Sequence, residues 1–259
     1  MPVDILYMGR KAVAAKLLER LCAIKDVRIA GVLTDNHLGQ SVTTEVAQRY
    51  GLRIYSFTEA LQAMEQGSLK FDLGVSMLYW RKLRDGFLSI PSLGTINFHP
   101  APLPDYKGTA GYNMAILEGL EKWAVSAHYV DEEIDTGAII EVRWFPIDPA
   151  SETAMSLEQK SAGEIYKLAE DVIFTILNRR ARLPTTKNEG GVYISRRQME
   201  EMKEVKPGDD LERKVRAFWF PPYDGAFVTI GGVKYTLVNR FLLEQLADKT
   251  STSLFTEKS

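Results

Sequence analysis

An amide and an imidazole stand two residues apart at the end of one predicted strand. Asn97 and His99 belong to the stretch Thr-Ile-Asn-Phe-His-Pro, whose β-branched and aromatic residues favour a strand that the proline ends. Side chains alternate across a strand, so Asn97 and His99 share one face. An imidazole can transfer protons near neutral pH, and an amide N–H can stabilise an oxyanion. The two residues could also be a hydrogen-bonded structural pair, and the sequence alone leaves both readings open.

A third candidate, Asp135, lies in the stretch Asp-Glu-Glu-Ile-Asp-Thr-Gly at residues 131–137. A carboxylate near an imidazole can orient it and favour its charged form. Aspartate is also common in turns, so Asp135 could cap the turn before Thr136 and Gly137. The two roles are compatible.

Strands and helices alternate through the first two-thirds of the chain. This alternation predicts an α/β fold, with a Rossmann-like, mostly parallel sheet and helices on both faces. The apolar spacing predicts helices at 11–24, 43–50, 58–66 and 156–177, and strands at 3–8, 27–33, 53–55, 71–76, 95–99, 125–130 and 138–144.

The composition changes after the long predicted helix. We expect a catalytic domain at residues 1–182 and a small C-terminal subdomain at residues 183–259, joined through a linker or turn rich in glycine and proline. The subdomain should contain a charged helix at 209–218 and a hairpin with strands at 226–230 and 234–238. The polar tail after Lys249 is expected to fray.

Overall composition excludes several classes of protein. The chain has 259 residues, of which 45% are hydrophobic and 25% charged, and its formal charge of −2 provides no basic field for nucleic acid. The single cysteine, Cys22, suits a reducing compartment. No signal peptide is evident, and no apolar run approaches the ~18 residues of a membrane span, so we expect a cytoplasmic protein.

The sequence argues against three common kinds of cofactor site. The turn after the first predicted strand has one glycine, Gly9, where a dinucleotide fingerprint needs three. No Walker A pattern occurs, and no cysteine and histidine cluster has zinc spacing, so no metal site is expected.

Three motifs together resemble one enzyme family. Asn-x-His-Pro at 97–100, Leu-Pro-Asp-Tyr-Lys-Gly at 103–108 and Ile-Asp-Thr-Gly at 134–137 are similar to the folate-dependent formyltransferases. The resemblance covers roughly residues 3–179. Lys107 departs from it, since many members carry arginine there; lysine keeps the charge but loses bidentate geometry.

The resemblance implies direct transfer of a formyl group from 10-formyltetrahydrofolate to an amine. The reaction passes through a tetrahedral oxyanion, to which Asn97 and protonated His99 can donate hydrogen bonds. His99 would serve as the acid/base group and Asp135 would orient or charge it. The pterin is expected in a pocket lined by residues on both sides, namely Met77, Leu78, Tyr79, Asp131, Ile134 and Gly137.

The C-terminal part of the sequence indicates which class of acceptor to expect. A transfer-RNA formyltransferase should carry a larger basic domain, whereas residues 185–259 hold 12 lysines and arginines against 11 acidic residues. The chain is most like the nucleotide-sugar N-formyltransferases, which implies an amino-dideoxy sugar such as GDP-perosamine or dTDP-Qui4N, used for bacterial O-antigen or lipopolysaccharide. Lys107, Trp219 and Tyr223 are the expected acceptor contacts. The aromatic segment 218–223 could instead be a packing corner.

Other readings are kept beside this one. They are a methionyl-tRNA formyltransferase, a glycinamide ribonucleotide formyltransferase, and a folate-binding regulatory module without turnover. The resemblance leaves a homodimer open and predicts no nucleic-acid or membrane partner. Of the other histidines, His128 is expected to be a hydrogen-bonded core residue, and His37 a loop residue that could touch substrate.

Overall fold

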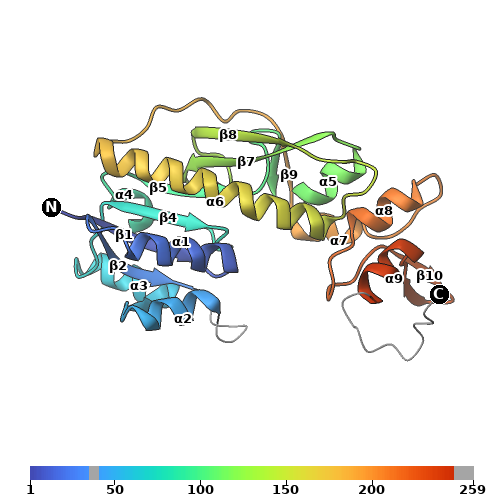
Figure 1. Cartoon of the computed structure of the whole chain (residues 1–259), viewed down its shortest axis with the longest axis horizontal. Coiled ribbons are helices and arrows are strands. Elements are labelled where there is room, and N and C mark those ends of the chain that lie inside the picture. Colours follow the sequence, from blue (N-terminus) through green and yellow to red (C-terminus); the bar gives the residue numbers. More distant parts are fainter. Residues whose placement is uncertain (35–40, 248–259) are drawn as a thin grey trace, which may run out of the picture.

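A seven-stranded sheet forms the centre of the molecule (Figure 1). The computed structural model describes residues 1–34 and 41–247, so the predictions for His37 and for the tail after Lys249 lie outside the described residues. The strand order is β3-β2-β1-β4-β5-β7-β8. The strands are β1 (Val3–Gly9), β2 (Val27–Leu33), β3 (Ile54–Tyr55), β4 (Leu73–Met77), β5 (Thr95–His99), β7 (Lys122–Tyr129) and β8 (Ile139–Pro146).

The first five strands of that order run parallel, and β7 and β8 are antiparallel to their neighbours. The predicted Rossmann-like α/β fold is therefore confirmed. Two strands, β2 and β5, have the bounds that the sequence predicts. The others differ by a few residues at their ends, where strand propensity is weakest.

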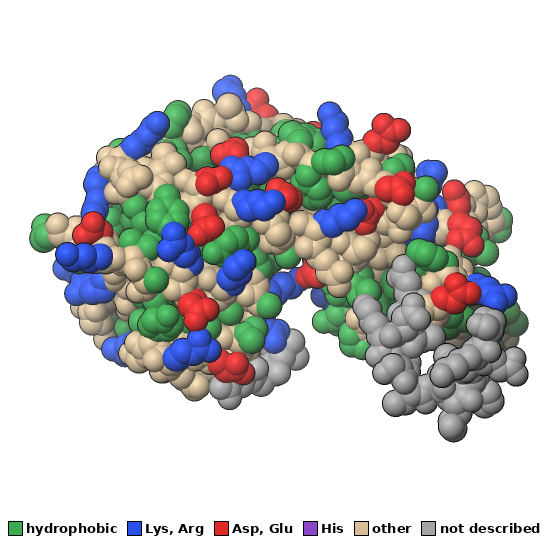
Figure 2. All heavy atoms as spheres, in the orientation of Figure 1, with side chains coloured by type: hydrophobic (Ala, Val, Ile, Leu, Met, Phe, Trp, Pro, Cys, Tyr) green, Lys and Arg blue, Asp and Glu red, His purple; other side chains and the backbone are tan. Residues whose placement is uncertain are grey.

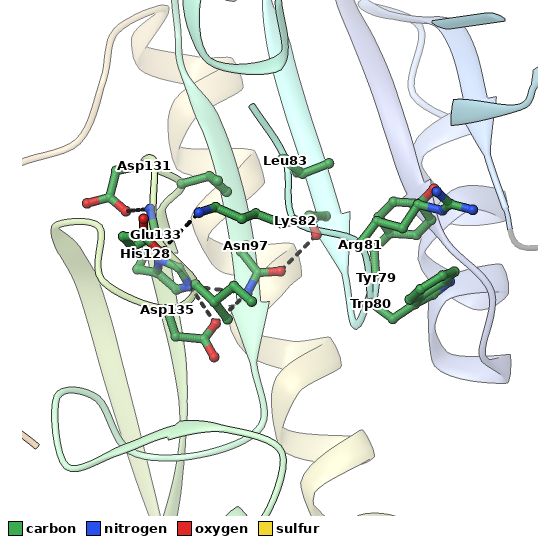
Figure 3. Close-up of a pocket in the computed structure, with 13 residues that line it drawn as sticks. Tyr79, Trp80, Arg81, Lys82, Leu83, Asn97, His128, Asp131, Glu133 and Asp135 are labelled. Atoms are coloured by element: carbon green, nitrogen blue, oxygen red, sulfur yellow. Dashed lines mark hydrogen bonds and ion pairs between the residues drawn. The ribbon is translucent and has the colours of Figure 1, made fainter. Parts of the chain in front are cut away.

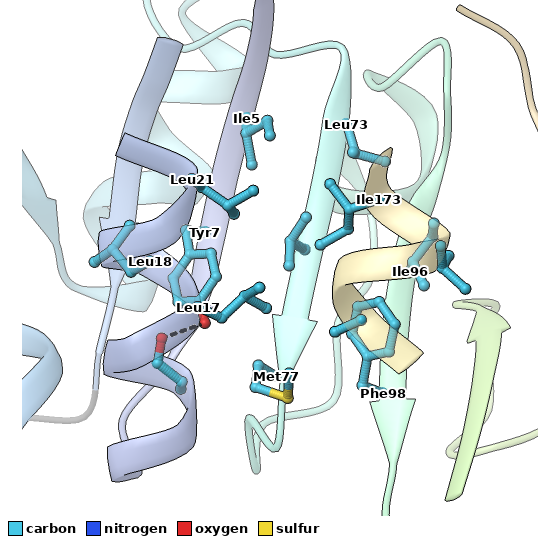
Figure 4. Packing of buried hydrophobic residues seen from close by; sticks show 14 of the residues in the cluster. Ile5, Tyr7, Leu17, Leu18, Leu21, Leu73, Met77, Ile96, Phe98 and Ile173 are labelled. Atoms are coloured by element: carbon cyan, nitrogen blue, oxygen red, sulfur yellow. Dashed lines mark hydrogen bonds between the residues drawn. The ribbon is translucent and has the colours of Figure 1, made fainter. Parts of the chain in front are cut away.

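Helices cover both faces of the sheet. One face packs on α1 (Ala12–Cys22), α2 (Val42–Arg49) and the long α6 (Ala154–Arg179), and the other on α3 (Phe57–Glu65) and the short α4 (Gly86–Ser89). Figure 4 shows the first interface, where Ile5 and Tyr7 of β1 meet Leu17 and Leu21 of α1. Their neighbours Leu6 and Met8 belong to the opposite cluster, as alternation along a strand requires.

Side-chain caps fix where the helices begin. Ser56 and Glu59 form a capping box at the start of α3, and Thr153 and Ser156 form one at the start of α6. These boxes satisfy backbone N–H groups that the first turn of a helix leaves free. The Thr153 cap explains why α6 starts at Ala154, two residues before the predicted start.

The C-terminal part holds shorter elements. The predicted helix and hairpin are present as α8 (Leu211–Ala217), β10 (Phe227–Ile230) and β11 (Val233–Thr236). The structure also contains elements that the sequence does not predict, namely α4, β6 (Tyr106–Gly108), α5 (Gly111–Leu117), β9 (Val192–Ile194), α7 (Arg196–Glu201) and α9 (Arg240–Ala247). Most of these have three to seven residues, too few for a periodic pattern, and α5 begins with a glycine and has no side-chain cap.

The predicted linker is bound tightly to the sheet domain. Thr186 exchanges backbone hydrogen bonds with Ile139, and β9 pairs in parallel with β6. A second apolar cluster joins Val215, Phe218, Trp219 and Leu242 of the C-terminal part to Ile116 of α5 and Ala154 of α6. The boundary after residue 182 stays a prediction. Within the described residues, no helix is both long and apolar enough to cross a bilayer.

Candidate active site

Three neighbouring strands place polar side chains side by side at one edge of the sheet. Ser76 of β4 pairs in register with Asn97 of β5, and Asn97 pairs with His128 of β7. Ser76 Oγ donates to Asn97 Oδ1 at 2.8 Å, and Asn97 Nδ2 lies 3.1 Å from His128 Nε2 (Figure 3). These contacts turn the N–H₂ end of Asn97 toward His128 and Asp135.

The same contacts assign the tautomer of His128. Its Nδ1 lies 2.8 Å from the Tyr129 carbonyl oxygen, which can only accept, so Nδ1 carries the hydrogen. The Asn97 amide nitrogen can only donate, so His128 Nε2 accepts from it. His128 is buried and hydrogen-bonded as predicted, but it also holds Asn97 in place.

Asp135 lies at the centre of the group, with 8% of its side chain exposed. Its Oδ1 is 3.5 Å from Asn97 Nδ2 and 3.6 Å from His128 Nε2. Its Oδ2 accepts from the Gly108 N–H at 3.0 Å and lies 3.4 Å from His99 Nδ1. Burial opposes ionisation, but the two imidazoles and the Gly108 N–H outweigh it and lower the pKa of Asp135 to about 2. Asp135 is therefore a carboxylate at neutral pH.

The surroundings of His99 act on its protonation in opposite directions. Its Nε2–H donates to the Tyr106 carbonyl at 2.9 Å, which leaves Nδ1 facing Asp135. Burial lowers the pKa of His99 below 6.5; the Asp135 carboxylate opposes this shift, and His128 adds to it. The expectation that a protonated His99 donates to an oxyanion stays a prediction. A proton on Nδ1 would be held between His99 and Asp135.

The loop that carries Asp135 has an unusual backbone. Asp135 has φ of 57°, in the left-handed region that residues other than glycine rarely adopt. Gly137 follows, and a Cβ there would come within 1.8 Å of the Tyr129 carbonyl oxygen, so only glycine fits. Such strained conformations are typical of functional sites.

A cavity opens beside Asn97, His128 and Asp135. The segment after β4 forms one wall and the 131–137 loop forms the other, and Lys82 bridges them by an ion pair with Glu133 at 3.0 Å (Figure 3). Of the predicted pterin contacts, Tyr79, Asp131 and Ile134 line this cavity. Met77 is buried in the core and Gly137 packs under the loop, so neither lines it.

A second and larger cavity, of about 440 Å³, lies between the sheet domain and the C-terminal part. Phe218, Phe220 and Tyr223 line one side, with the cations Lys11 and Arg196 nearby. A smaller cavity of about 110 Å³, which contains Leu78 and Pro100, shares Lys11, Tyr112 and Glu158 with it. Together they form a groove that leads toward the end of β5. Figure 2 shows a hollow between the two parts of the molecule.

The predicted acceptor residues have different positions. Tyr223 is 61% exposed and lines the groove, whereas Trp219 is 7% exposed and packs in the C-terminal apolar cluster. Trp219 therefore has the role of a packing residue. Lys107 donates to the Gly190 carbonyl at 2.8 Å and binds the linker rather than lining either cavity.

Two residues of the site were missed from the sequence as site residues, namely Ser76 and His128. Alternation along β7 offers a signal for His128, because Ser126 and His128 share a polar face of an otherwise apolar strand. Ser76 ends an apolar strand and has no comparable signal. Within residues 1–34 and 41–247, no group of three or more histidine, cysteine or acidic side chains could hold a metal ion.

Comparisons with known proteins identify the family of the chain. The family model described as "Formyl transferase" matches residues 30–173. The methionyl-tRNA formyltransferase of Roseiflexus sp. (strain RS-1) is 28% identical over 266 residues, which cover 96% of this chain and 80% of that protein.

Solved structures show the same fold. A 4-N formyltransferase from Francisella tularensis superposes with a TM-score of 0.75 at 19% identity, covering 92% of this chain and 97% of the other. An N-formyltransferase from Helicobacter canadensis, in complex with folinic acid and dTDP-3-aminofucose, gives a TM-score of 0.70 at 22% identity, covering 93% and 89%. The chain is a formyl-transfer enzyme and belongs to the formyl transferase family.

Proposed function

We propose that this enzyme transfers the formyl group of 10-formyltetrahydrofolate to the amino group of a nucleotide-linked amino-dideoxy sugar. The observation that carries the proposal is the larger cavity of the groove, of about 440 Å³, whose aromatic and cationic side chains could contact a base and a diphosphate. The Helicobacter canadensis relative was solved with a folate and a nucleotide-linked amino sugar, which supports both substrates.

The cavity beside Asn97 suits the folate. Tyr79 and Ile134 offer apolar surface to a pterin ring, and the Asp131 carboxylate can accept from its N–H groups. The Lys82–Glu133 ion pair crosses between the two walls and is exposed, so its exchange for a substrate contact has a small energetic cost. The formyl carbon would then lie near Asn97.

In the proposed reaction the acceptor amine attacks the formyl carbon, and a C–N bond forms as the carbonyl oxygen becomes an oxyanion. Asn97 Nδ2 donates to that oxyanion, because Ser76 and His128 already fix its orientation. The amine proton passes to the His99–Asp135 pair, where Nδ1 and Oδ2 lie 3.4 Å apart. The oxyanion collapses, the bond to the folate nitrogen breaks, and the proton held by the His99–Asp135 pair passes to that nitrogen.

The groove contains cations that a diphosphate could bind. Lys11 is paired with Glu158 and Arg196 with Glu200, so a bound diphosphate would replace these carboxylates as partners. Tyr223 is exposed there and can stack on a base. Acidic Glu158, Glu200 and Asp224 lie among them, so the groove lacks the continuous basic surface that a transfer RNA needs.

A second candidate function is the formylation of methionyl-tRNA. The similarity to methionyl-tRNA formyltransferases extends over nearly the whole chain and favours it. Against it stands the mixture of acidic and basic side chains on the visible surface of the molecule (Figure 2).

Steady-state kinetics with 10-formyltetrahydrofolate distinguishes the two candidates. The panel would contain nucleotide-linked 3-amino and 4-amino sugars, methionyl-tRNA and glycinamide ribonucleotide. We expect the highest kcat/KM with one of the sugars. Turnover with methionyl-tRNA alone would refute the sugar assignment, and folate binding without any turnover would favour the regulatory module.

A further inference from the structure

The segment that follows α6 reaches back to the loop of Asp135. Asn188 donates from Nδ2 to the Asp135 carbonyl at 2.9 Å and to the Gly137 carbonyl at 2.8 Å. Both partners are carbonyl oxygens, which only accept, so the two hydrogens of one amide nitrogen are both used. The Asn188 side chain is therefore hydrogen-bonded to both ends of the 135–137 segment.

The 135–137 segment has an unfavourable backbone conformation, so contacts from outside the loop are needed to stabilise it. Asp135 has φ of 57°, and Gly137 packs against the Tyr129 carbonyl. Within the loop, Asp131 accepts from the Glu133 N–H and from the Thr136 hydroxyl, which stabilises its outer part. Asn188 supplies the hydrogen bonds on the inner part, where the backbone is least favourable.

The same segment after α6 is also bound to β6. Lys107 donates to the Gly190 carbonyl, and β9 pairs with β6. Strand β6 provides the carbonyl that accepts from His99 Nε2 and the Gly108 N–H that donates to Asp135. Residues 186–194 thus contact both backbones that hold the His99–Asp135 pair.

The Asn188 amide is oriented so that its nitrogen makes hydrogen bonds and its oxygen makes none within the described residues. Its Oδ1 is shielded from solvent and has no hydrogen-bond partner within the described residues. An unpaired buried carbonyl costs stability. A residue that only filled space would not need to bury an unpaired carbonyl oxygen in order to donate two hydrogen bonds.

We propose that Asn188 is a positioning residue for formyl transfer, which holds the 135–137 peptide so that the Asp135 carboxylate meets His99 and Asn97. The inference rests on the proposed role of Asp135 in the reaction. Asn188 lies in the predicted linker, outside the three motifs of the sheet domain. The linker would therefore contribute to the chemistry.

The first test is single-turnover formyl transfer by Asn188→Ala. We expect the transfer rate to fall roughly 10–100-fold, since small misplacements of reacting groups cost about 10²-fold, while the folate KM stays within about twofold. The matched control is Glu189→Ala, because Glu189 is exposed on the same segment and pairs only with Lys187 among the described residues. The control should keep the wild-type rate.

A double-mutant cycle separates positioning from general weakening of the fold. In an Asp135→Asn background, Asn188→Ala should slow transfer by less than about threefold, because the group that it positions is already lost. If Asn188→Ala slows transfer as much in the Asp135→Asn background as in the wild-type enzyme, the proposal is overturned. If Asn188→Ala fails to fold, Asn188→Asp provides the second variant, since its carboxylate keeps the size but cannot donate to two carbonyls. A wild-type rate in Asn188→Asp would also overturn the proposal.

The second test needs no acceptor and so distinguishes this proposal from the proposed function. NMR can follow the titration of His99 in the free enzyme, because the chain has three histidines, and His37 and His128 can be identified by substitution. The groups that act on His99 are Asp135, His128 and the Tyr106 carbonyl, and Asp135 raises its pKa. Asn188→Ala should therefore lower the pKa of His99. An unchanged titration would overturn the positioning role, whereas a wild-type enzyme without transfer would refute only the proposed function.

Discussion

At the scale of single residues, the site depends on one carboxylate that faces in two directions. Asp135 Oδ1 faces Asn97 and His128, and Oδ2 faces His99 and the Gly108 N–H. The Asp135 carboxylate stays ionised, and burial favours the neutral form of His99, so in the proposed reaction the pair accepts one proton from the attacking amine. The same pair could return the proton to the departing folate nitrogen.

Replacing Asp135 with asparagine tests this account. We expect kcat to fall by about 10²–10⁴, as general acid–base contributions typically do, with little change in the folate KM. The pH–rate profile should also change shape, because the carboxylate no longer opposes the lowering of the His99 pKa. Glu132→Gln, an exposed position in the same loop, is the control. An unchanged rate and profile would reduce Asp135 to a turn residue.

Burial of a neutral His99 also predicts how stability depends on pH. The folded pKa is lowered from 6.5, so between the two values the unfolded chain binds more protons than the folded chain. The free energy of unfolding should therefore fall as the pH drops below 6.5 and until it reaches the folded pKa. Urea unfolding at pH 8 and pH 5 would measure this loss. It should be smaller in His99→Asn, where the group is absent; an equal loss in both proteins would show that His99 is not the cause.

At the scale of elements, regular patterns predicted the sheet, and irregular contacts completed the site. The strand that carries Asn97 and His99 has the bounds expected from its β-branched residues and its proline. The glycine-rich segment around Asn188 has no periodicity, so a linker was the natural interpretation. Its role depends on two carbonyl contacts between residues more than fifty positions apart, which local propensity does not encode. The short β6 and β9 become strands only by pairing with each other.

The aromatic segment divides into two roles that mutation can separate. Tyr223→Ala should raise the acceptor KM by ~5–150-fold, which corresponds to the ~1–3 kcal/mol of base stacking, and leave the melting temperature near wild type. Trp219→Ala should lower the melting temperature, because it leaves a cavity in the C-terminal cluster at a cost of ~3–5 kcal/mol. Folate KM should be unchanged in Tyr223→Ala. If Tyr223→Ala changes only the melting temperature, the base binds elsewhere.

At the scale of the whole molecule, the cavities proposed for the folate and for the acceptor both open near the end of β5. The folate cavity lies between the segment after β4 and the 131–137 loop, and the acceptor groove lies between the sheet domain and the C-terminal part. The long α6 supports both, because its first turns line the groove and its apolar face packs on the sheet. In the proposed reaction, the fold thus brings an amine to a formyl group without a covalent enzyme intermediate.

Competition between acceptors tests the central claim most directly. One reaction would contain the enzyme, formyl-labelled 10-formyltetrahydrofolate, and equal concentrations of methionyl-tRNA and of the best nucleotide-linked amino sugar, and the label would be followed into each product. The account predicts that the sugar gains the label at least about tenfold faster, and that Tyr223→Ala reduces this preference. Label that enters methionyl-tRNA first, with none in the sugar, would contradict it.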